Sequence, residues 1–378
     1  MKILQVSTVV NTLNAFLIPY AKSFSQEGWI VDAASRDCTT VKSVIVNHNE
    51  CFNIDFSRNP FNLFAIFRSF YQIRRILFSG RYDVVHVHTP VAAFLVRLAS
   101  VGLRETKIFY TAHGFHYVVG NPKWKNMIFY CLEKLAGYRT NHLFVINNDD
   151  FKFANESKIV PSCDISLING IGVNISQYRN DENARKYYRK QFGINEKTFV
   201  ISHVAELNRN KNHRVVIDAL SLFKKNNPNS DFRYFVIGDG YMRKTLEKMV
   251  KELSLEKEVH FLGHRNDVNS ILSSSDLLTL SSIREGLPRC ILEAMCCSLP
   301  VIASNIRGCR DLLGSGAGVL VEHSNVEQWS QAIQMVYSQP YIRKRMSDVG
   351  HELVNELYEE SVVVRSVLDI YKRLNTKC

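Results

Sequence analysis

The chain has 378 residues, more than one hydrophobic core usually organises, so its length predicts two domains of ordinary size. A composition of 46% hydrophobic and 22% charged residues, with only 9 prolines and 18 glycines, excludes a disordered or fibrous protein. The 47 lysines and arginines outnumber the 36 acidic residues, and the net charge of +11 favours an anionic partner such as nucleotide phosphate, nucleic acid or acidic lipid.

Short apolar runs alternate with helix-length segments in the first half of the chain, at 3–6, 30–34, 84–87, 108–111 and 143–146. A second series follows residue 180, at 199–204, 234–237, 259–262, 277–280, 301–303 and 319–321. Short runs rich in valine and isoleucine indicate buried parallel strands of a doubly wound sheet. The sequence therefore predicts two Rossmann-like α/β domains in tandem.

The join between the two series lies near residues 167–178, where Asn169, Gly170 and Gly172 interrupt the apolar pattern before a charged helix at 181–192. We place an N-terminal domain at residues 1–175, a C-terminal domain at 176–360 and a last helix at 361–378. Because open α/β sheets bind ligands at the carboxyl ends of their strands, the two domains are expected to face one cleft.

The cysteine count and the apolar runs bear on the cellular compartment. The nine cysteines include no Cys-x-x-Cys pair and suggest neither a disulfide framework nor a zinc spacing. No stretch reaches the roughly 18 uninterrupted apolar residues of a membrane span, and the first residues resemble a strand more than a signal peptide. We expect a protein of the reducing cytosol that is neither secreted nor transmembrane.

In the first half, His113 leaves the strand at 108–111 beside Gly114. Its imidazole can meet a sugar hydroxyl or a donor phosphate, or it can be structural. His86 and His88 alternate along the preceding strand and so share one face of the sheet. Without a Glu-x-x-His or cysteine partner they do not predict a metal site.

Two apolar stretches in the first half, 61–78 and 123–139, carry interspersed basic residues, which in the first stretch are Arg68, Arg74 and Arg75. Helices of this composition can lie on an anionic membrane. An ordinary core helix with exposed arginines gives the same pattern.

In the second half, Arg209 and Lys211 follow the strand at 199–204 and precede a helix at 215–224. An ammonium about 4 Å from a phosphate oxygen interacts by roughly 4 kcal/mol at an effective dielectric near 20. A helix terminus contributes only about 0.3 to 2 kcal/mol. Lys211 is therefore expected to matter more for phosphate binding than a helix dipole, unless this is only a basic surface loop.

Two further loops follow strands of the second half. Gly238 and Gly240 let the backbone approach a ligand, although an ordinary turn has the same glycines. Arg265 lies in the loop after the next strand, which either borders a nucleobase or is a bare connection.

Residues 281–300 form the most informative segment, because they leave a predicted strand and open a helix near Pro288. Proline at the first helical position is preorganised, and the free N–H groups that follow, with the helix dipole, form a site for a diphosphate. Glu293 lies inside this helix, where its two oxygens can accept hydrogen bonds from the paired hydroxyls of a ribose. An ion pair between Arg289 and Glu293, four residues apart, is the structural alternative.

The ordered set of these motifs resembles the retaining glycosyltransferases of family 4 over nearly the whole chain. The likeness is carried by 111–116 (TAHGFH), 210–212 (NKN), 238–240 (GDG), and Glu285 and Glu293 with seven residues between them. Similar proteins build capsular, exopolysaccharide or lipid-linked repeat units in bacteria. The resemblance implies a GT-B fold, in which the last helix crosses back to the N-terminal domain.

When the roles of the family's residues are assigned to the matching positions of this sequence, the resemblance implies that Lys211 binds the donor diphosphate and Glu293 binds its ribose. It assigns Glu285 to the hydroxyls of the transferring sugar and His113 to the sugar or phosphate, so that Lys211, Glu285 and His113 are the catalytic residues. The donor-binding set comprises Glu293, Arg209, Gly238, Gly240, Arg265, Gly286, Leu287, Pro288 and Arg289. The acceptor side comprises Asn11, Asn14 and His116. No metal and no other cofactor are implied, because cationic side chains and helix termini neutralise the leaving diphosphate.

The chain departs from the family pattern in two places. Residues 205–207 (AEL) stand where the family often has Gly-Arg-Leu, so Arg209 is only a candidate substitute for the missing arginine. The glycine-rich loop after the first strand is replaced by residues 7–13 (STVVNTL).

The sequence thus predicts a retaining hexosyltransferase that moves a sugar from a nucleotide diphosphate donor, expected to be a UDP-sugar, to a polyprenyl-diphosphate-linked saccharide. An anionic membrane surface, on the inner face of the cell membrane, is the expected third partner. One alternative is a UDP-sugar 2-epimerase of the same architecture. Another is a basic nucleic-acid-binding protein, but no helix-turn-helix, zinc finger or RNA-binding aromatic signature is present.

Overall fold

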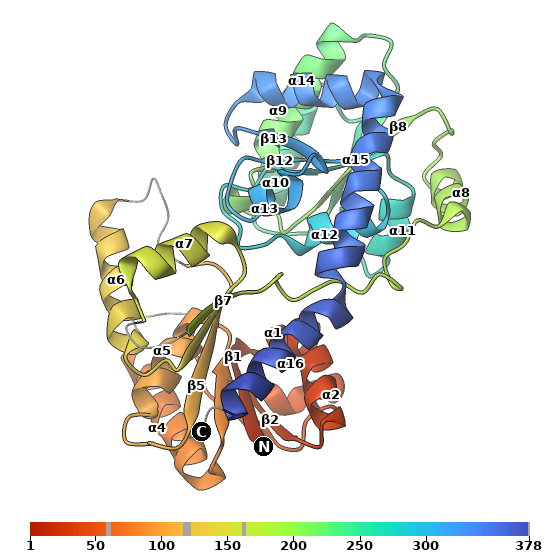
Figure 1. The fold of residues 1–378 in the computed structure, drawn as a ribbon. Helices are drawn as coiled ribbons and strands as arrows, with labels where there is room; N and C mark the ends of the chain where they lie inside the picture. The colour runs from red at the N-terminus through yellow and green to blue at the C-terminus, as the bar shows by residue number, and fades with distance from the viewer. Residues whose placement is uncertain (58–61, 116–121, 161–163, 377–378) are drawn as a thin grey trace. The chain divides into compact units, whose positions relative to one another are not determined.

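The computed structural model describes residues 1–57, 62–115, 122–160 and 164–376. The chain divides into two compact units, one formed by Met1–Ile171 with Glu360–Cys378 and the other by Gly172–Glu359 (Figure 1). Each unit has its own parallel sheet and its own hydrophobic core. The predicted pair of Rossmann-like domains is confirmed.

The sheet of the N-terminal unit has seven parallel strands among the described residues, in the order β3-β2-β1-β4-β5-β6-β7. The strands are β1 (Lys2–Val9), β2 (Ile30–Arg36), β3 (Cys51–Asn53), β4 (Val84–Val87), β5 (Lys107–Ala112), β6 (His142–Val145) and β7 (Asp164–Leu167). The strands β2 and β3 lie on one side of β1, and the later strands from β4 onwards lie on its other side. Such sheets bind ligands at this switch in strand order, between β1 and β4.

Helices cover both faces of this sheet. They are α1 (Val10–Thr12), η1 (Leu13–Leu17), α2 (Ile18–Gln26), η2 (Cys38–Thr40), α3 (Lys42–Ile45), α4 (Leu63–Gly80), α5 (Pro90–Ala99), α6 (Lys123–Gly137), α7 (Asn148–Ser157) and α16 (Glu360–Thr376). Side chains of α4, α5 and α7 share one core with the sheet. In α4 the buried positions Ser69, Ile73 and Leu77 recur every four residues, as a helix with one core-facing stripe requires.

The helix α16 closes the other face of the N-terminal sheet, although it comes last in the chain (Figure 1). The ring of Tyr371 lies 4.8 Å from that of Phe24 in α2 and 4.9 Å from that of Phe109 in β5. The Nζ of Lys107 donates a hydrogen bond to the carbonyl of Leu374 at 2.7 Å. The last helix therefore completes the core of the first domain.

The sheet of the C-terminal unit has six parallel strands in the order β10-β9-β8-β11-β12-β13. They are β8 (Phe199–Val204), β9 (Phe232–Ile237), β10 (Val259–Gly263), β11 (Leu277–Leu280), β12 (Val301–Ser304) and β13 (Gly318–Val321). Here the chain reverses between β8 and β11, so the loops after these two strands stand next to each other at the carboxyl edge of the sheet.

The helices of the C-terminal unit are α8 (Glu182–Gln191), η3 (Arg209–Lys211), α9 (His213–Asn226), α10 (Arg243–Glu252), α11 (Val268–Ser273), α12 (Arg289–Cys296), α13 (Cys309–Leu313), α14 (Val326–Ser338), α15 (Pro340–Leu353) and η4 (Val354–Tyr358). The predicted charged helix is α8, whose first turn is capped by the Asp181 carboxylate, which accepts the N–H groups of Asn183 and Ala184. None of the described helices combines the length and the apolar composition that crossing a bilayer requires.

Three features differ from the prediction. The strands β3 and β7 were not predicted, because each is short and lies at an edge of the sheet, where an uninterrupted apolar run is not needed. Residues 7–13, predicted as a loop, extend β1 to Val9 and then turn directly into helix. Pro288 is the N-cap of α12, so the helix begins at Arg289, one residue later than predicted.

Candidate functional site

Lys211 and Glu285 meet at the carboxyl edge of the C-terminal sheet, although they lie 74 residues apart in the chain. The Nζ of Lys211 lies 2.5 Å from Oε1 of Glu285, and both side chains are largely buried. Burial lowers the pKa of Lys211, but the attraction of Glu285 and neighbouring groups outweighs this, and the net pKa is raised. The lysine therefore carries its positive charge at neutral pH.

Hydrogen bonds fasten the two loops that carry this pair. The Ser281 hydroxyl donates to the carbonyls of Lys211 and Asn212 at 3.0 and 2.8 Å. The Ile283 N–H donates to the Asn210 carbonyl at 2.7 Å, and the Asn210 amide donates back to the carbonyl of residue 284 at 3.0 Å. The charged pair is thus held in place before any ligand binds, which is the condition for electrostatic preorganisation.

The glycines of the loop after β9 are required by close packing. A Cβ on Gly238, whose φ is 133°, would overlap the Ala205 carbonyl, and a Cβ on Gly240 would overlap the backbone of Leu207. The Leu207 N–H donates to the Asp239 carbonyl at 3.0 Å. These glycines therefore let the loop after β9 lie against the loop that carries Lys211.

Two predicted donor-binding arginines lie beside these loops. The Arg209 N–H donates to the Tyr241 hydroxyl at 3.1 Å, while the Arg209 side chain is exposed. Arg265 makes two hydrogen bonds to Asp267, at 2.8 and 2.5 Å, and Asp267 also accepts the Tyr188 hydroxyl. The charge of Arg265 is thus matched by a neighbouring carboxylate, whereas that of Arg209 faces solvent.

The N-terminus of α12 lies next to Glu285. Its N-cap, Pro288, makes no side-chain capping hydrogen bond, and the helix dipole favours an anion at this end. A Cβ on Gly308 would overlap the Gly286 carbonyl, so the loop after β12 packs directly under residues 286–287. This packing brings the predicted residues Gly286, Leu287 and Pro288 to one place beside Glu285.

Arg307 is a functional candidate that the sequence reasoning missed. Its Nε donates to the carbonyl of Glu285 at 3.3 Å from the loop after β12. A basic residue just after a strand is the signal that identified Lys211, and the same rule applied to β12 finds Arg307. It is a better placed cation for this site than Arg209, because it contacts the Glu285 segment directly.

Glu293 is buried on α12, with a residue exposure of 9%. Its Oε1 lies 3.1 Å from Nε of Arg289, so the predicted structural ion pair exists. Tyr178 lies near enough to this carboxylate for the two groups to influence each other's pKa. Burial raises the pKa of Glu293, and Arg289 and Tyr178 oppose that shift. A carboxylate has about four lone-pair sites, so two contacts leave capacity for ribose hydroxyls.

Tyr178 was not predicted as a site residue. It ends the segment that joins the two series of strands, and it is packed against the core around α12. An aromatic residue with a polar tip at the end of such a join is the only signal in the sequence, and many surface loops share it.

In the N-terminal unit, His113 lies just beyond the end of β5. Burial lowers its pKa to about 4, so the ring is neutral at physiological pH, and its Nε2 has no hydrogen-bond partner among the described residues. Asn11 and Asn14 lie on the helical turns after β1, where Asn14 Oδ1 accepts the Ser43 hydroxyl at 2.5 Å. His116, predicted for the acceptor side, lies outside the described residues.

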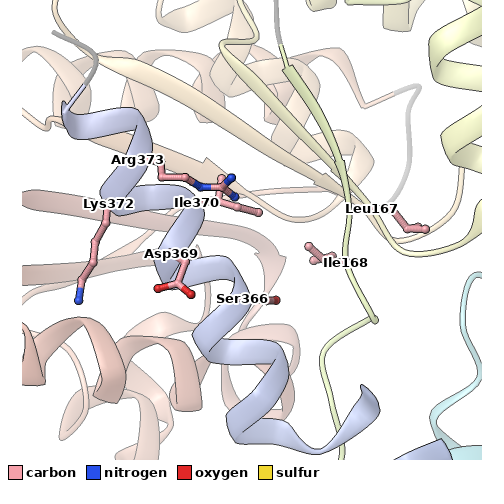
Figure 2. A pocket seen from close by; sticks show the side chains of 7 residues that line it. All are labelled: Leu167, Ile168, Ser366, Asp369, Ile370, Lys372 and Arg373. Carbon is pink, nitrogen blue, oxygen red and sulfur yellow. The ribbon is translucent and has the colours of Figure 1, made fainter. Parts of the chain in front are cut away.

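Within the described part of the chain, no three His, Cys, Asp or Glu side chains are grouped so that they could hold a metal ion. A cavity of about 590 Å³ lies between α16 and the end of β7 (Figure 2). Its described lining residues are Leu167, Ile168, Ser366, Asp369, Ile370, Lys372 and Arg373. None of these is a predicted catalytic or binding residue, so this cavity is separate from the candidate site.

Comparison with protein families gives two matches. Residues 184–352 match the family described as "Glycosyl transferases group 1", and residues 3–147 match the family described as "Glycosyl transferase 4-like". The first match covers most of the C-terminal unit and the second most of the N-terminal unit.

Two relatives match most of the chain. The sequence is 33% identical over 377 residues to EpsD of Bacillus subtilis (strain 168), which is named as a glycosyltransferase, and the match covers 98% of this chain and 96% of EpsD. It is 27% identical over 307 residues to an Escherichia coli protein named UDP-Gal:alpha-D-GlcNAc-diphosphoundecaprenol alpha-1,3-galactosyltransferase, which covers 81% of this chain and 77% of that protein.

Two solved structures share the architecture. Sucrose-phosphate synthase of Thermosynechococcus elongatus has a TM-score of 0.83 at 17% identity, covering all of both chains. HepE of Anabaena in complex with UDP has a TM-score of 0.82 at 18% identity, covering 99% of this chain and 100% of that one. At such identities the likeness establishes the fold alone, which is GT-B.

Proposed function

Because this chain belongs to the glycosyl transferases of group 1 and is a hexosyltransferase, we propose that it moves a hexose from a UDP-sugar to a saccharide linked to a polyprenyl diphosphate, with retention of anomeric configuration. The main support is the contact between Lys211 and Glu285 beside the N-terminus of α12. A positive charge and the positive end of a helix dipole suit a diphosphate, and a carboxylate suits sugar hydroxyls. These two chemistries are adjacent in a nucleotide sugar.

In the proposed reaction the bond between the anomeric carbon and the diphosphate oxygen breaks, and its electron pair passes to that oxygen. The acceptor hydroxyl attacks the anomeric carbon from the face that the diphosphate leaves, and its proton passes to the departing phosphate oxygen. Negative charge therefore grows on the diphosphate as the bond breaks. Lys211 and the α12 N-terminus stabilise that charge most in the transition state, and this is how they accelerate transfer.

The remaining predicted residues hold the donor in this scheme. Glu293 accepts the two ribose hydroxyls, and Glu285 accepts hydroxyls of the transferring sugar while it keeps Lys211 in place. No enzyme nucleophile takes part, and we propose that no bound metal does either.

The identities of donor and acceptor draw on the relatives. The name of the Escherichia coli protein specifies a UDP-linked donor and a diphosphoundecaprenol-linked acceptor. The HepE structure holds UDP. We propose that this chain likewise uses a UDP-linked donor and a polyprenyl-diphosphate-linked acceptor.

A donor screen tests this function. Thermal-shift assays with UDP, GDP and ADP should give the largest stabilisation with UDP, because a ligand that binds only the folded state raises its melting temperature. Labelled UDP-hexoses are then incubated with polyprenyl-diphosphate-linked saccharides, and label should pass to the lipid fraction with the α-configuration retained. Conversion of the UDP-sugar to its 2-epimer without acceptor would favour the epimerase alternative instead.

The N-terminal unit supports a further element of the proposal, which is association with an anionic membrane at the cytoplasmic face. Two helices, α4 and α6, expose large apolar side chains that recur with the helical period, so that each presents one apolar stripe. The stripe of α4 is Phe64, Phe67, Tyr71 and Phe78. The stripe of α6 is Trp124, Met127, Ile128, Leu132 and Leu135, and Tyr138 extends it just after the helix ends.

The arginines of α4 contribute less to this surface than the sequence suggested. Arg68 pairs with Asp55 at 2.7 Å, and Arg74 donates to the carbonyls of Ala99 and Val101. Arg75 is exposed beside the stripe. We therefore expect membrane binding to come mainly from insertion of the apolar side chains into the lipid. Arg75 adds electrostatic attraction to anionic lipid.

Vesicle binding tests the membrane proposal. The double variant Phe64→Ser, Phe67→Ser should sediment at least about tenfold less with phosphatidylglycerol vesicles, because two large apolar side chains are removed from the stripe. Tyr341→Ser, which removes an equally exposed ring from the C-terminal unit, is the matched control and should bind normally. Unchanged sedimentation of the double variant would refute the assignment of α4.

A further inference from the structure

Two cysteines with free thiols lie at one edge of the N-terminal sheet, where β3 is the last strand. Cys51 begins β3, and Cys38 lies in the short helix η2, which follows the neighbouring strand β2. Cys38 is buried, with an exposure of 0%, while Cys51 is partly exposed. Neither cysteine belongs to the candidate functional site, so their placement needs a separate explanation.

The pairing of β2 with β3 decides which way the Cys51 side chain points. Cys51 pairs with Ala33, and Asn53 pairs with Ser35. Because alternate residues of a strand point to the same side of a sheet, Cys51 and Asn53 share one face. Phe52, which lies between them, packs against the core that the sheet shares with α4. The Cys51 side chain therefore points away from that core.

The helix η2 folds back over the face that Cys51 and Asn53 share. The Asn53 Oδ1 accepts the Thr39 N–H at 3.1 Å, and the Asn53 Nδ2 donates to the Thr39 hydroxyl at 2.6 Å. These two hydrogen bonds hold η2 on β3. Since Thr39 follows Cys38 directly in the chain, they bring Cys38 and Cys51 together on the same face of the sheet.

The two thiols lie close enough to shift each other's pKa, and they do so in opposite directions. Cys51 lowers the pKa of Cys38, and this effect outweighs the burial of Cys38, which would raise it. Cys38 and burial both raise the pKa of Cys51. Because the thiolate is the nucleophile in thiol chemistry, Cys38 is the cysteine that attacks first, and Cys51 keeps its proton.

The buried cysteines of α12 and of the residue after it have the opposite character. Burial raises the pKa of Cys290, Cys296 and Cys297 to about 12, so these thiols stay protonated and unreactive at neutral pH. The pair in the N-terminal unit also lies at a sheet edge, where Cys51 reaches the surface. A small oxidant such as hydrogen peroxide can therefore approach it.

We propose that Cys38 and Cys51 form a dithiol that a hydroperoxide oxidises reversibly to a disulfide. The Cys38 thiolate attacks one oxygen of hydrogen peroxide, the O–O bond breaks, and the other oxygen leaves with its electron pair and takes up a proton to become water. The sulfur of Cys51 then attacks the resulting sulfenic acid and displaces its hydroxyl, which leaves as a second water with the proton of Cys51. The two sulfurs together lose two electrons, and the peroxide gains them. This inference does not depend on the proposed function.

Peptide mapping of the whole, fully reduced protein tests the proposal. The protein is treated with a small molar excess of hydrogen peroxide, and the remaining thiols are blocked with N-ethylmaleimide. Trypsin cuts after Lys42, between the two cysteines, so that only a disulfide joins peptide 37–42 to peptide 43–58. Mass spectrometry should find these linked peptides as the main oxidised product, and dithiothreitol should separate them.

Two variants check the order of the steps. Cys51→Ser should stop the reaction at the sulfenic acid of Cys38, which dimedone traps, because the second thiol is missing. Cys131→Ser, which removes an exposed cysteine of α6, is the matched control and should form the linked peptides at an unchanged rate. A non-reducing gel of the oxidised protein should show monomers, because the disulfide forms within one chain.

Three results would overturn the proposal. One is oxidation of the exposed Cys131 while Cys38 and Cys51 stay reduced. Another is a Cys38 that passes to the sulfinic acid without any linked peptides, which would mean that Cys51 is too far away to react. The third is a linked product that runs as a dimer, because the bond would then join two chains. The main experiment uses the unaltered protein, so it decides the question even if Cys51→Ser does not fold.

Discussion

The two units of this protein share an architecture but differ in the charges at the carboxyl edges of their sheets. The C-terminal edge carries ion pairs, between Lys211 and Glu285 and between Arg289 and Glu293, next to two buried histidines, His203 and His213, whose pKa burial lowers. The N-terminal edge holds buried neutral imidazoles, of which His88 and His113 are the clearest. The repeated fold therefore supplies the position of a site, and the local charges decide which ligand the site suits.

The largest effect on sugar transfer is expected from removing the lysine at the C-terminal edge. Lys211→Ala should lower the rate of sugar transfer at least about 100-fold, which corresponds to about 2.7 kcal/mol, because it removes the main charge that stabilises the leaving diphosphate. Initial rates with a labelled donor measure this, and circular dichroism checks the fold. The matched control is Lys224→Ala, which removes a lysine paired with Glu258 in the same unit and should transfer normally. Near-normal turnover of Lys211→Ala would remove this residue from the mechanism.

The second prediction concerns the ribose carboxylate. Glu293→Gln should weaken UDP binding roughly 10- to 100-fold, the range expected for hydrogen bonds to a charged acceptor. Because burial raises the pKa of Glu293, this carboxyl takes up its proton at a higher pH than an exposed glutamate. UDP affinity of the unaltered protein should therefore fall as the pH is lowered towards that value. In Glu293→Gln this pH dependence should disappear. Titration calorimetry from pH 7.5 to 5 measures both, and an unaltered affinity in the variant would exclude the ribose role.

A smaller effect is expected at Tyr178, which lies near the same carboxylate. Tyr178→Phe should weaken UDP binding about fivefold, because the Tyr178 hydroxyl favours the charged form of Glu293. It should also shift the acid fall in affinity to higher pH, because the Tyr178 hydroxyl opposes the raised pKa of Glu293. In a background that already carries Glu293→Gln, the same change should have little effect. Equal losses in both backgrounds would mean that Tyr178 acts on packing alone.

The smallest effect is expected from removal of metal ions. After dialysis against EDTA, transfer should remain within about twofold of its starting rate, because Lys211 and the α12 terminus are proposed to neutralise the diphosphate. A large loss that magnesium or manganese restores would show that the charged edge needs a cation that side chains do not supply.

The buried strands could be predicted because helices cover both faces of each sheet, which makes runs such as β8 and β11 mostly apolar. The edge strands β3 and β7 lack that signal. Motif spacing located Glu285, Glu293 and Lys211, and the four-residue separation of Arg289 and Glu293 indicated their ion pair.

The contacts that complete the candidate site could not be predicted in the same way. The ion pair of Lys211 with Glu285 and the contacts of Tyr178 and Arg307 join residues far apart in the chain. Local patterns cannot encode these contacts, because they depend on which strands become neighbours.

The helix α16 has a consequence for how the protein is made. Synthesis delivers β1 to β7 first, yet the rings of Phe24, Trp29 and Phe109 are covered by Tyr371, which follows the whole C-terminal unit in the chain. The N-terminal domain emerges first from the ribosome, and one apolar face of its sheet therefore stays uncovered until the C-terminal domain has been synthesised. A chain that stops before residue 360 should keep a sound C-terminal domain and aggregate through its N-terminal one.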